Sequence, residues 1–251
     1  MNIISKIFYP KNFLFLSMAL LFMSVLLLSI SLYCIFNLVP DDELQGSLVK
    51  IMYIHVPSAW LSLFLYFIFS VFSLLYLIKD SPLFDMAATS IAYVCICMTS
   101  IAILTGAIWG KPAWGTWWVW DARLTSMLIL FFILAGYFAI RDFFNDEARS
   151  ASIGAIFAII GAVNIPIIKF SVNLWSTLHQ PSSIIRASGP SIHASMLYPI
   201  FSMFLGILLF CLLIVLIKMN TKIYQKKSIA KYARKLGSTL KNTAFRTQNT
   251  Q

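Results

Sequence analysis

The residues best suited to hold a large ligand lie in one short stretch, Trp114-Gly-Thr-Trp117-Trp118-Val-Trp120-Asp121-Ala-Arg123, which contains four of the seven tryptophans of the chain. Indole rings at this density form a flat aromatic surface on which a planar molecule can stack. If the stretch is helical, its spacing places three rings on the same face as Asp121, namely those of Trp114, Trp117 and Trp118. An aromatic belt at a membrane interface is the simpler interpretation, but such a belt needs neither an Asp nor an Arg. The stretch therefore predicts a binding surface for a flat, charged molecule.

Two histidines could supply metal ligands beside this surface. His55 lies in Ile51-Met-Tyr-Ile-His55-Val-Pro57, and His179 lies in Trp175-Ser-Thr-Leu-His179-Gln180. A lone histidine at a helix end is usually an interfacial residue, but two of them flanking a tryptophan surface indicate ligation. Imidazole binds haem iron, and the porphyrin ring stacks on aromatic side chains. Its propionates pair with cations, for which the candidates are Arg123, Lys50 and Arg186. One ligand, haem b bound without a covalent link, satisfies all three features, whereas His193 has no tryptophan beside it and is interpreted as structural.

The composition excludes a soluble domain of this length. The chain is 60% hydrophobic and 11% charged, with a mean hydropathy of +0.84. Six apolar runs are each long enough to cross a bilayer as a helix; they cover 12–40, 51–78, 86–110, 124–140, 150–168 and 187–217. The runs do not alternate as the strands of a membrane barrel would. We therefore expect an all-α integral membrane protein with six transmembrane helices and an external, amphipathic tryptophan-rich segment.

The distribution of charge suggests a topology. Residues 1–218 form the predicted membrane domain, with a tryptophan-rich loop at about 109–126, and residues 219–251 form a basic tail that we expect to be partly disordered. The tail provides most of the net charge of +10. Because basic residues favour the cytoplasmic side, the tail places both termini in the cytoplasm and the loops at about 37–50, 109–123 and 169–194 outside. The connections at 79–85 and 141–149 are interpreted as solvated helix ends, and the tail is expected to contact the lipid bilayer rather than nucleic acid.

Several classes of function are disfavoured by what the sequence lacks. It has no C-x-x-C-H motif for covalent attachment of haem and no G-x-x-x-x-G-K-[ST] phosphate loop, so we expect a protein that is not itself an enzyme. A b-type haem oxidoreductase subunit would need paired histidines inside its spans. A haem-transporting permease would need charged residues within the apolar runs, where none occurs. These two remain as the alternative functions.

The run from Trp109 to Ser126, together with the two histidine segments, resembles the tryptophan-rich (WWD) family of haem-handling membrane proteins, and within it the haem exporter protein C (CcmC) family of cytochrome c biogenesis. The resemblance covers about residues 13–218. It implies that haem is held on the outer face of a bacterial inner membrane, or of a mitochondrial inner membrane, with His55 and His179 as axial ligands. It also implies delivery to the haem chaperone CcmE and a complex with the ATP-binding-cassette subunits CcmA and CcmB and the small protein CcmD. Lys50 stands where this family is expected to have an Arg, so the charge is kept but the bidentate fork is lost.

Overall fold

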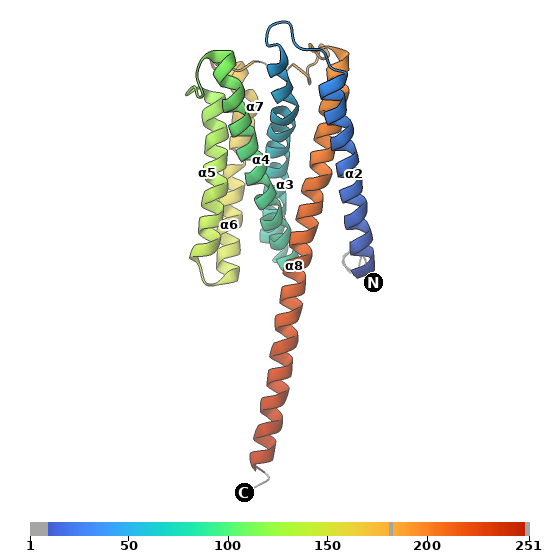
Figure 1. The fold of residues 1–251 in the computed structure, drawn as a ribbon. Coiled ribbons are helices and arrows are strands. Elements are labelled where there is room, and N and C mark those ends of the chain that lie inside the picture. Colours follow the sequence, from blue (N-terminus) through green and yellow to red (C-terminus); the bar gives the residue numbers. More distant parts are fainter. Residues whose placement is uncertain (1–9, 181–182, 249–251) are drawn as a thin grey trace.

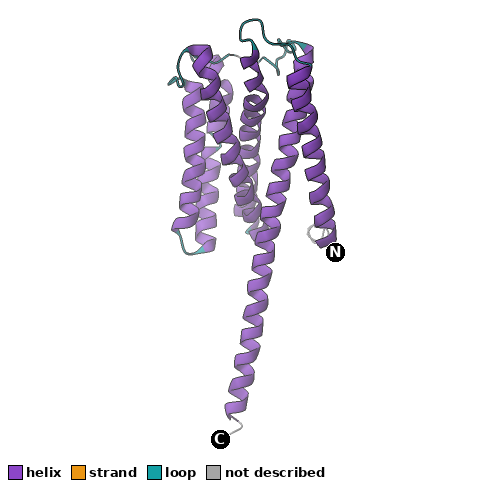
Figure 2. Ribbon diagram, viewed as in Figure 1, coloured by secondary structure: helices purple, strands orange, loops and turns teal. Residues whose placement is uncertain are grey.

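A computed structural model describes residues 10–180 and 183–248. Apart from the 3-10 helix η1 (Ser47–Ile51), the regular elements in this part of the chain are α-helices (Figures 1 and 2). They are α2 (Pro10–Asn37), α3 (Met52–Lys79), α4 (Pro82–Trp114), α5 (Ala122–Phe143), α6 (Glu147–Gly161), α7 (Asn164–Leu174) and α8 (Ala194–Gln248). Six helical segments are long and apolar enough to span a membrane, with α6 and α7 together forming one of them. The predicted all-α membrane fold with six spans is confirmed.

Two predicted boundaries are wrong for reasons that lie in single residues. The tryptophan-rich loop is shorter than 109–126 because α4 continues to Trp114 and α5 already begins at Ala122. Gly115 ends α4 in the left-handed conformation, at φ 77°, and Asp121 caps the first turn of α5. The last span begins at Ala194 rather than 187, after Gly189 at φ 81°.

Most of the basic tail is part of helix α8, and its partial disorder stays a prediction. Helix α8 continues without a break to Gln248, well beyond the apolar part of the helix, and projects from the bundle in Figure 1. A helix that already exists adds residues at little cost, because its nucleation is complete. Lys, Ala, Leu and Arg, which are frequent in this segment, are good helix formers. The tail therefore leaves the bundle along the axis of α8.

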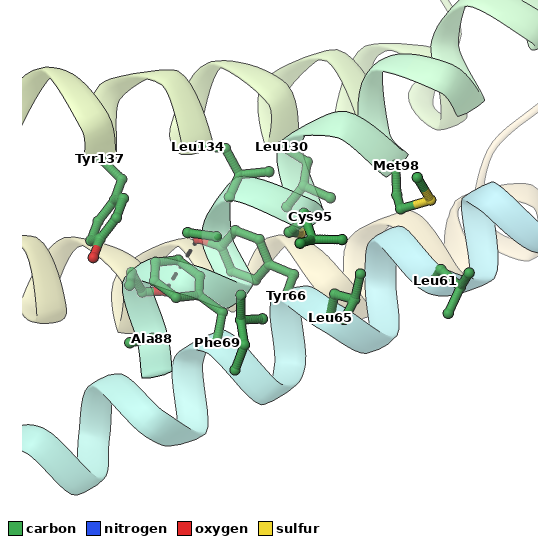
Figure 3. Close-up of a cluster of buried hydrophobic side chains, with 14 of the residues drawn as sticks. Leu61, Leu65, Tyr66, Phe69, Ala88, Cys95, Met98, Leu130, Leu134 and Tyr137 are labelled. Carbon is green, nitrogen blue, oxygen red and sulfur yellow. Dashed lines mark hydrogen bonds between the residues drawn. The ribbon is translucent and has the colours of Figure 1, made fainter. Parts of the chain in front are cut away.

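The core lies between the middle of α3 and the helices that surround it. Figure 3 shows aromatic and aliphatic side chains meeting there. They come from α3 (Leu61, Leu65, Tyr66, Phe69), α4 (Ala88, Cys95, Met98) and α5 (Leu130, Leu134, Tyr137). Helix α2 packs mainly on α8, and these two form a second, smaller cluster with the start of α3. The segments 38–46, 115–121, 175–180 and 183–193 lie at the same end of the bundle (Figure 1). The packing of the helices therefore brings the segments that carry the tryptophans and His179 to one end of the bundle.

The connections at 79–85 and 141–149, at the opposite end of the bundle, were interpreted as solvated helix ends, and one charge pair there contradicts this. The other charged residues of these connections are exposed, as the interpretation expects. Arg141 on α5 donates two hydrogen bonds to Asp85 on α4, at 2.8 and 3.0 Å. The two side chains are only 13% and 10% exposed. The interpretation failed because the sequence shows both residues at span ends, where charges are usually hydrated, but does not show that α4 and α5 bring them face to face. The pair ties the two helices together away from the loops.

Candidate functional site

A pocket opens among the helix ends that carry the three loop segments. Its empty volume is about 1000 Å³, including space open to the surroundings. The walls come from α3 (His55, Ala59, Trp60, Leu63), α4 (Ala102 to Trp114), α5 (Arg123, Leu124, Met127) and α7 (Ile168), and loop residues Gln45, Trp118, His179 and Gln180 complete it. Leu63 lies two turns along α3 from His55, so the pocket extends down between the helices. The flat external surface expected from the sequence is therefore one wall of a cleft lined mostly by apolar residues.

His55 enters this pocket from the second turn of α3. Its Nδ1 lies 3.0 Å from the carbonyl oxygen of Ala102 and 3.2 Å from Oγ1 of Thr105, both on α4. A carbonyl only accepts hydrogen bonds, so Nδ1 carries the proton and Nε2 keeps its lone pair. Metal-binding histidines are oriented in this way by a bond from the second ring nitrogen. His55 is thereby held in the tautomer that a metal ligand requires.

His179 enters the same pocket from the loop after α7. Its Nδ1 lies 2.9 Å from the carbonyl oxygen of Gln180, which again leaves Nε2 as the free acceptor. Burial, together with the positive charge of Arg123, lowers the pKa of His179 and favours the neutral imidazole. The neutral form is the one that binds metals.

The two imidazoles lie close together in the lining of this pocket. Their ring centroids are 6.5 Å apart, and their planes are tilted by 38°. Imidazole nitrogen binds a metal at about 2 Å, and a ring centre lies about 1 Å behind its nitrogen, so two rings that share one metal are about 6 Å apart. The spacing therefore fits one metal ion held between His55 and His179.

The tryptophans of the signature stretch divide into two groups. Trp114 and Trp118 line the pocket, and the ring of Trp114 lies 6.3 Å from that of His179. Trp117 and Trp120 are 58% and 76% exposed and do not line it. The prediction that Trp114, Trp117, Trp118 and Asp121 share a helix face is wrong, because the helix ends at Trp114 and the chain turns there. Only two of the four rings are therefore in place to contact a ligand in the pocket.

One of the three candidate cations lines the pocket. Arg123 is partly buried there, and among the described residues its guanidinium makes a single long hydrogen bond, 3.4 Å to the carbonyl of Ile168. Lys50 instead pairs with Asp41 at 3.1 Å, and Arg186 is exposed outside the pocket. A guanidinium has five N–H donors, so Arg123 retains donors for a ligand carboxylate.

Asp121 does not line the pocket, and both of its carboxylate oxygens accept hydrogen bonds from other parts of the chain. One carboxylate oxygen accepts the backbone N–H of Leu124 at 2.8 Å and caps α5. The other accepts a hydrogen bond from the hydroxyl of Thr177, in the loop that carries His179. Asp121 therefore connects the tryptophan-rich turn to the histidine loop.

Sequence reasoning missed four residues that shape the pocket. Gly106 and Gly110 leave room for rings: a Cβ at Gly106 would lie 2.9 Å from the His55 ring, and one at Gly110 would lie 3.0 Å from the Trp114 ring. Trp109 lies edge-on to His55 at 5.8 Å and donates to the side-chain oxygen of Gln45 at 2.7 Å. The spacing of small residues, Ala102, Gly106, Gly110 and Ala113, was the available signal for this face of α4.

Comparison with known proteins gives a consistent result. A family model described as "Heme exporter protein C" matches residues 4–234. The chain belongs to this family. The Heme exporter protein C of Bradyrhizobium diazoefficiens is 45% identical over 81% of this chain and 77% of its own length. A putative cytochrome c biosynthesis ccmC-like mitochondrial protein of Marchantia polymorpha is 48% identical over 71% and 75%. The Heme exporter protein C of Escherichia coli K12 is 37% identical over 80% of each chain.

Membership in the Heme exporter protein C family makes this chain a multi-pass membrane protein that handles haem in cytochrome c maturation. The pocket fits such a cargo by its own chemistry. It combines two imidazoles whose tautomer leaves Nε2 as the acceptor, aromatic and apolar walls, and a guanidinium that makes a single hydrogen bond to the described residues. Its components match the iron, the ring and the carboxylates of haem, respectively.

Proposed function

We propose that this chain holds haem b non-covalently and transiently, with His55 and His179 as axial ligands, and passes it to the haem chaperone CcmE. The observation that carries this proposal is the pair of imidazoles at 6.5 Å, each with Nδ1 on a backbone carbonyl, so that the tautomer leaves Nε2 as the acceptor. The tautomer and spacing are those that two ligands of one iron need.

The walls of the pocket support the assignment of the rest of the ligand. Trp114 and Trp118 provide aromatic surface for the porphyrin, and Arg123 provides donors for a propionate. Trp117 and Trp120, which are exposed, act as anchors at the membrane–water interface, where indole rings are favoured. The two sequence interpretations, ligand surface and interfacial belt, thus apply to different tryptophans.

The topology of the proposed function follows the charge of the tail. Helix α8 carries its basic residues away from the end of the bundle that holds the histidines (Figure 1). Basic segments remain on the cytoplasmic side, so both termini are cytoplasmic and the pocket faces the periplasm of a bacterial inner membrane. In a mitochondrial inner membrane, the pocket would face the corresponding outer side.

The division of labour with partners follows from the chemistry this chain lacks. Without a phosphate loop in its sequence, the chain depends on other subunits for ATP hydrolysis, and we assign that role to a complex with CcmA and CcmB, with CcmD as a small additional subunit. This chain binds and orients haem and is not an enzyme with turnover of its own. A ligand held by stacking and two imidazoles, with an open edge of the pocket, can be transferred to an acceptor.

Haem titration of the detergent-solubilised protein tests the ligand set. We expect a low-spin bis-imidazole spectrum that is lost in His55→Ala and in His179→Ala. His193→Ala is the matched control, because His193 is exposed at the same end of the molecule and does not line the pocket. Equal haem binding in the wild type and both ligand variants would refute the proposal.

Delivery is tested separately in cells that contain the chaperone. We expect His55→Ala and His179→Ala to abolish haem-loaded CcmE while the variants still accumulate in the membrane. Trp114→Ala and Trp117→Ala form a matched pair: the first removes a pocket wall, and the second removes an exposed ring. Loading that depends on Trp117 as strongly as on Trp114 would contradict the assignment of these rings.

A further inference from the structure

The segment that carries His179 is not helical over 175–180 and 183–193, yet it holds one of the two neighbouring imidazoles of the pocket. Residues 175–193 connect α7 to α8, whereas His55 is part of α3. The hydrogen bond between His179 Nδ1 and the carbonyl of Gln180 joins neighbours in sequence, so it selects the tautomer but does not attach the loop to the bundle. Another contact must determine where His179 lies.

The hydrogen bonds around Thr177 provide that contact. Oγ1 of Thr177 accepts the backbone N–H of His179 at 3.0 Å. The same hydroxyl donates to Asp121, since a carboxylate can only accept. Among the described residues, the bond from Thr177 to Asp121 is the one hydrogen bond that connects 176–180 to the start of α5. The direction of each bond is therefore fixed from His179 through Thr177 to Asp121.

Asp121 is itself rigidly held at the start of α5. Its other oxygen accepts the N–H of Leu124, and the residue is 8% exposed. A carboxylate at a helix N-terminus is further stabilised by the helix dipole. A buried, charged acceptor makes a stronger hydrogen bond than a neutral one, so the bond from Thr177 is well suited to fix a loop.

We propose that Asp121 is a positioning residue that acts through Thr177 to hold His179 opposite His55. This inference rests on the proposed ligation of haem by the two histidines. It gives the Asp of the tryptophan-rich signature a role that does not involve contact with the ligand. Mutation of the outer hydrogen-bond partners of a metal-binding histidine typically lowers metal affinity by about 10- to 100-fold. We expect an effect of this size when the hydrogen bonds from His179 through Thr177 to Asp121 are broken.

Three substitutions separate the proposed role from a general effect on folding. Thr177→Val removes the hydroxyl and keeps the shape of the side chain, whereas Thr177→Ser keeps the hydroxyl. Asp121→Asn keeps an oxygen to cap α5, because Asn and Asp are equally good N-caps, but replaces the second acceptor by a donor. We expect Thr177→Val and Asp121→Asn to bind haem about tenfold more weakly and Thr177→Ser to bind it like the wild type.

The spectrum gives a readout that a purely structural role would not change. In Thr177→Val and Asp121→Asn, haem keeps His55 but loses the sixth ligand, so the low-spin spectrum is replaced by a high-spin one. Added imidazole should restore the low-spin spectrum, as it does when a ligand is missing from an intact pocket. The double variant Thr177→Val with Asp121→Asn should bind haem no more weakly than the weaker-binding of the two single variants, because both changes break the same series of hydrogen bonds.

A haem-free measurement distinguishes failure of this inference from failure of the proposed function. Modification of His179 by diethyl pyrocarbonate, located by mass spectrometry, should be several-fold faster in Thr177→Val than in the wild type or Thr177→Ser. Wild-type modification rates and spectra in Thr177→Val and Asp121→Asn would overturn the positioning role. Faster modification together with a wild-type spectrum that does not depend on His179 would support the positioning of the loop and overturn the ligation itself.

Discussion

Gly106→Ala tests whether the close approach of α4 to His55 is needed for haem binding. A Cβ at this position would lie 2.9 Å from Cε1 and 3.4 Å from Nδ1 of the imidazole. Non-bonded carbon atoms are most favourably separated by about 3.5–4.0 Å, so the ring must move by at least about 0.6 Å. Such a movement is away from α4, which carries the carbonyl of Ala102 that accepts from Nδ1 at 3.0 Å. The substitution therefore strains the bond that orients His55.

The expected magnitude follows from the contacts that oppose the movement. Trp109 lies edge-on to His55, and the His179 ring lies 6.5 Å from it, centroid to centroid. Overpacking of this kind costs about 1–3 kcal/mol. Because about 1.4 kcal/mol corresponds to a tenfold change in affinity, we expect haem affinity to fall by about ten- to hundredfold. The helix itself should not be weakened, since Ala is about 1 kcal/mol better than Gly in a helix interior.

The assay is haem titration of the purified variant, followed by the absorbance of the low-spin complex. Gly136→Ala on α5 is the control, because its new Cβ would meet the ring of Phe157 at 3.3 Å, outside the pocket. This variant shares the gain in helix propensity and should bind haem normally. Wild-type affinity and spectrum in Gly106→Ala, with normal accumulation of the protein, would refute the close packing of α4 against a ligating His55.

Three further predictions concern pH, the buried ion pair and the tail. Burial and Arg123 lower the pKa of His179 from its ordinary 6.5, so His179 is protonated, and lost as a ligand, only as the pH falls through the lowered pKa. Arg123→Gln removes the positive charge and should therefore move the loss of low-spin absorbance to higher pH. Arg141→Met leaves Asp85 buried without its partner and should lower stability by about 3 kcal/mol in unfolding measurements, whereas Arg141→Met combined with Asp85→Leu should recover most of it. Truncation after Lys222 should leave haem binding unchanged in the same titration, because the removed residues lie at the end of the bundle opposite the pocket; a loss of binding in a correctly inserted truncate would contradict this.

Much of the fold could be predicted because the bilayer constrains it so strongly. Apolar runs of sufficient length gave all six spans, and the grouping of three loops at one end followed from the order of the spans. The boundaries were less certain, because single residues such as Gly115 and Asp121 set them. The Arg141–Asp85 pair was missed for a different reason. Which charged ends of neighbouring helices meet depends on tertiary packing, which no local pattern records.

For the candidate site as well, the sequence predicted which residues take part better than it predicted where their side chains lie. Residue types pointed to His55, His179 and Arg123, and the structure brings all three to one pocket. The sequence predicted three of the tryptophan rings on one helix face, whereas the structure places only Trp114 and Trp118 in the pocket, because a helical period was applied across Gly115. This glycine turns the chain so that Trp117 and Trp120 face away while Trp118 remains in the pocket.

The turn after α4 explains why the signature needs both its tryptophans and its aspartate. A longer helix would place Trp117 and Asp121 on one face, but it would then carry Asp121 away from the start of α5. Ending α4 at Trp114 frees Asp121 to cap α5 and to bind Thr177 in the loop of His179. The same short segment thereby lines the pocket with Trp114 and Trp118 and, on the proposed account, anchors the second ligand. Two of the clustered tryptophans thus form a wall of the pocket, whereas the single Asp connects that wall to the loop of His179.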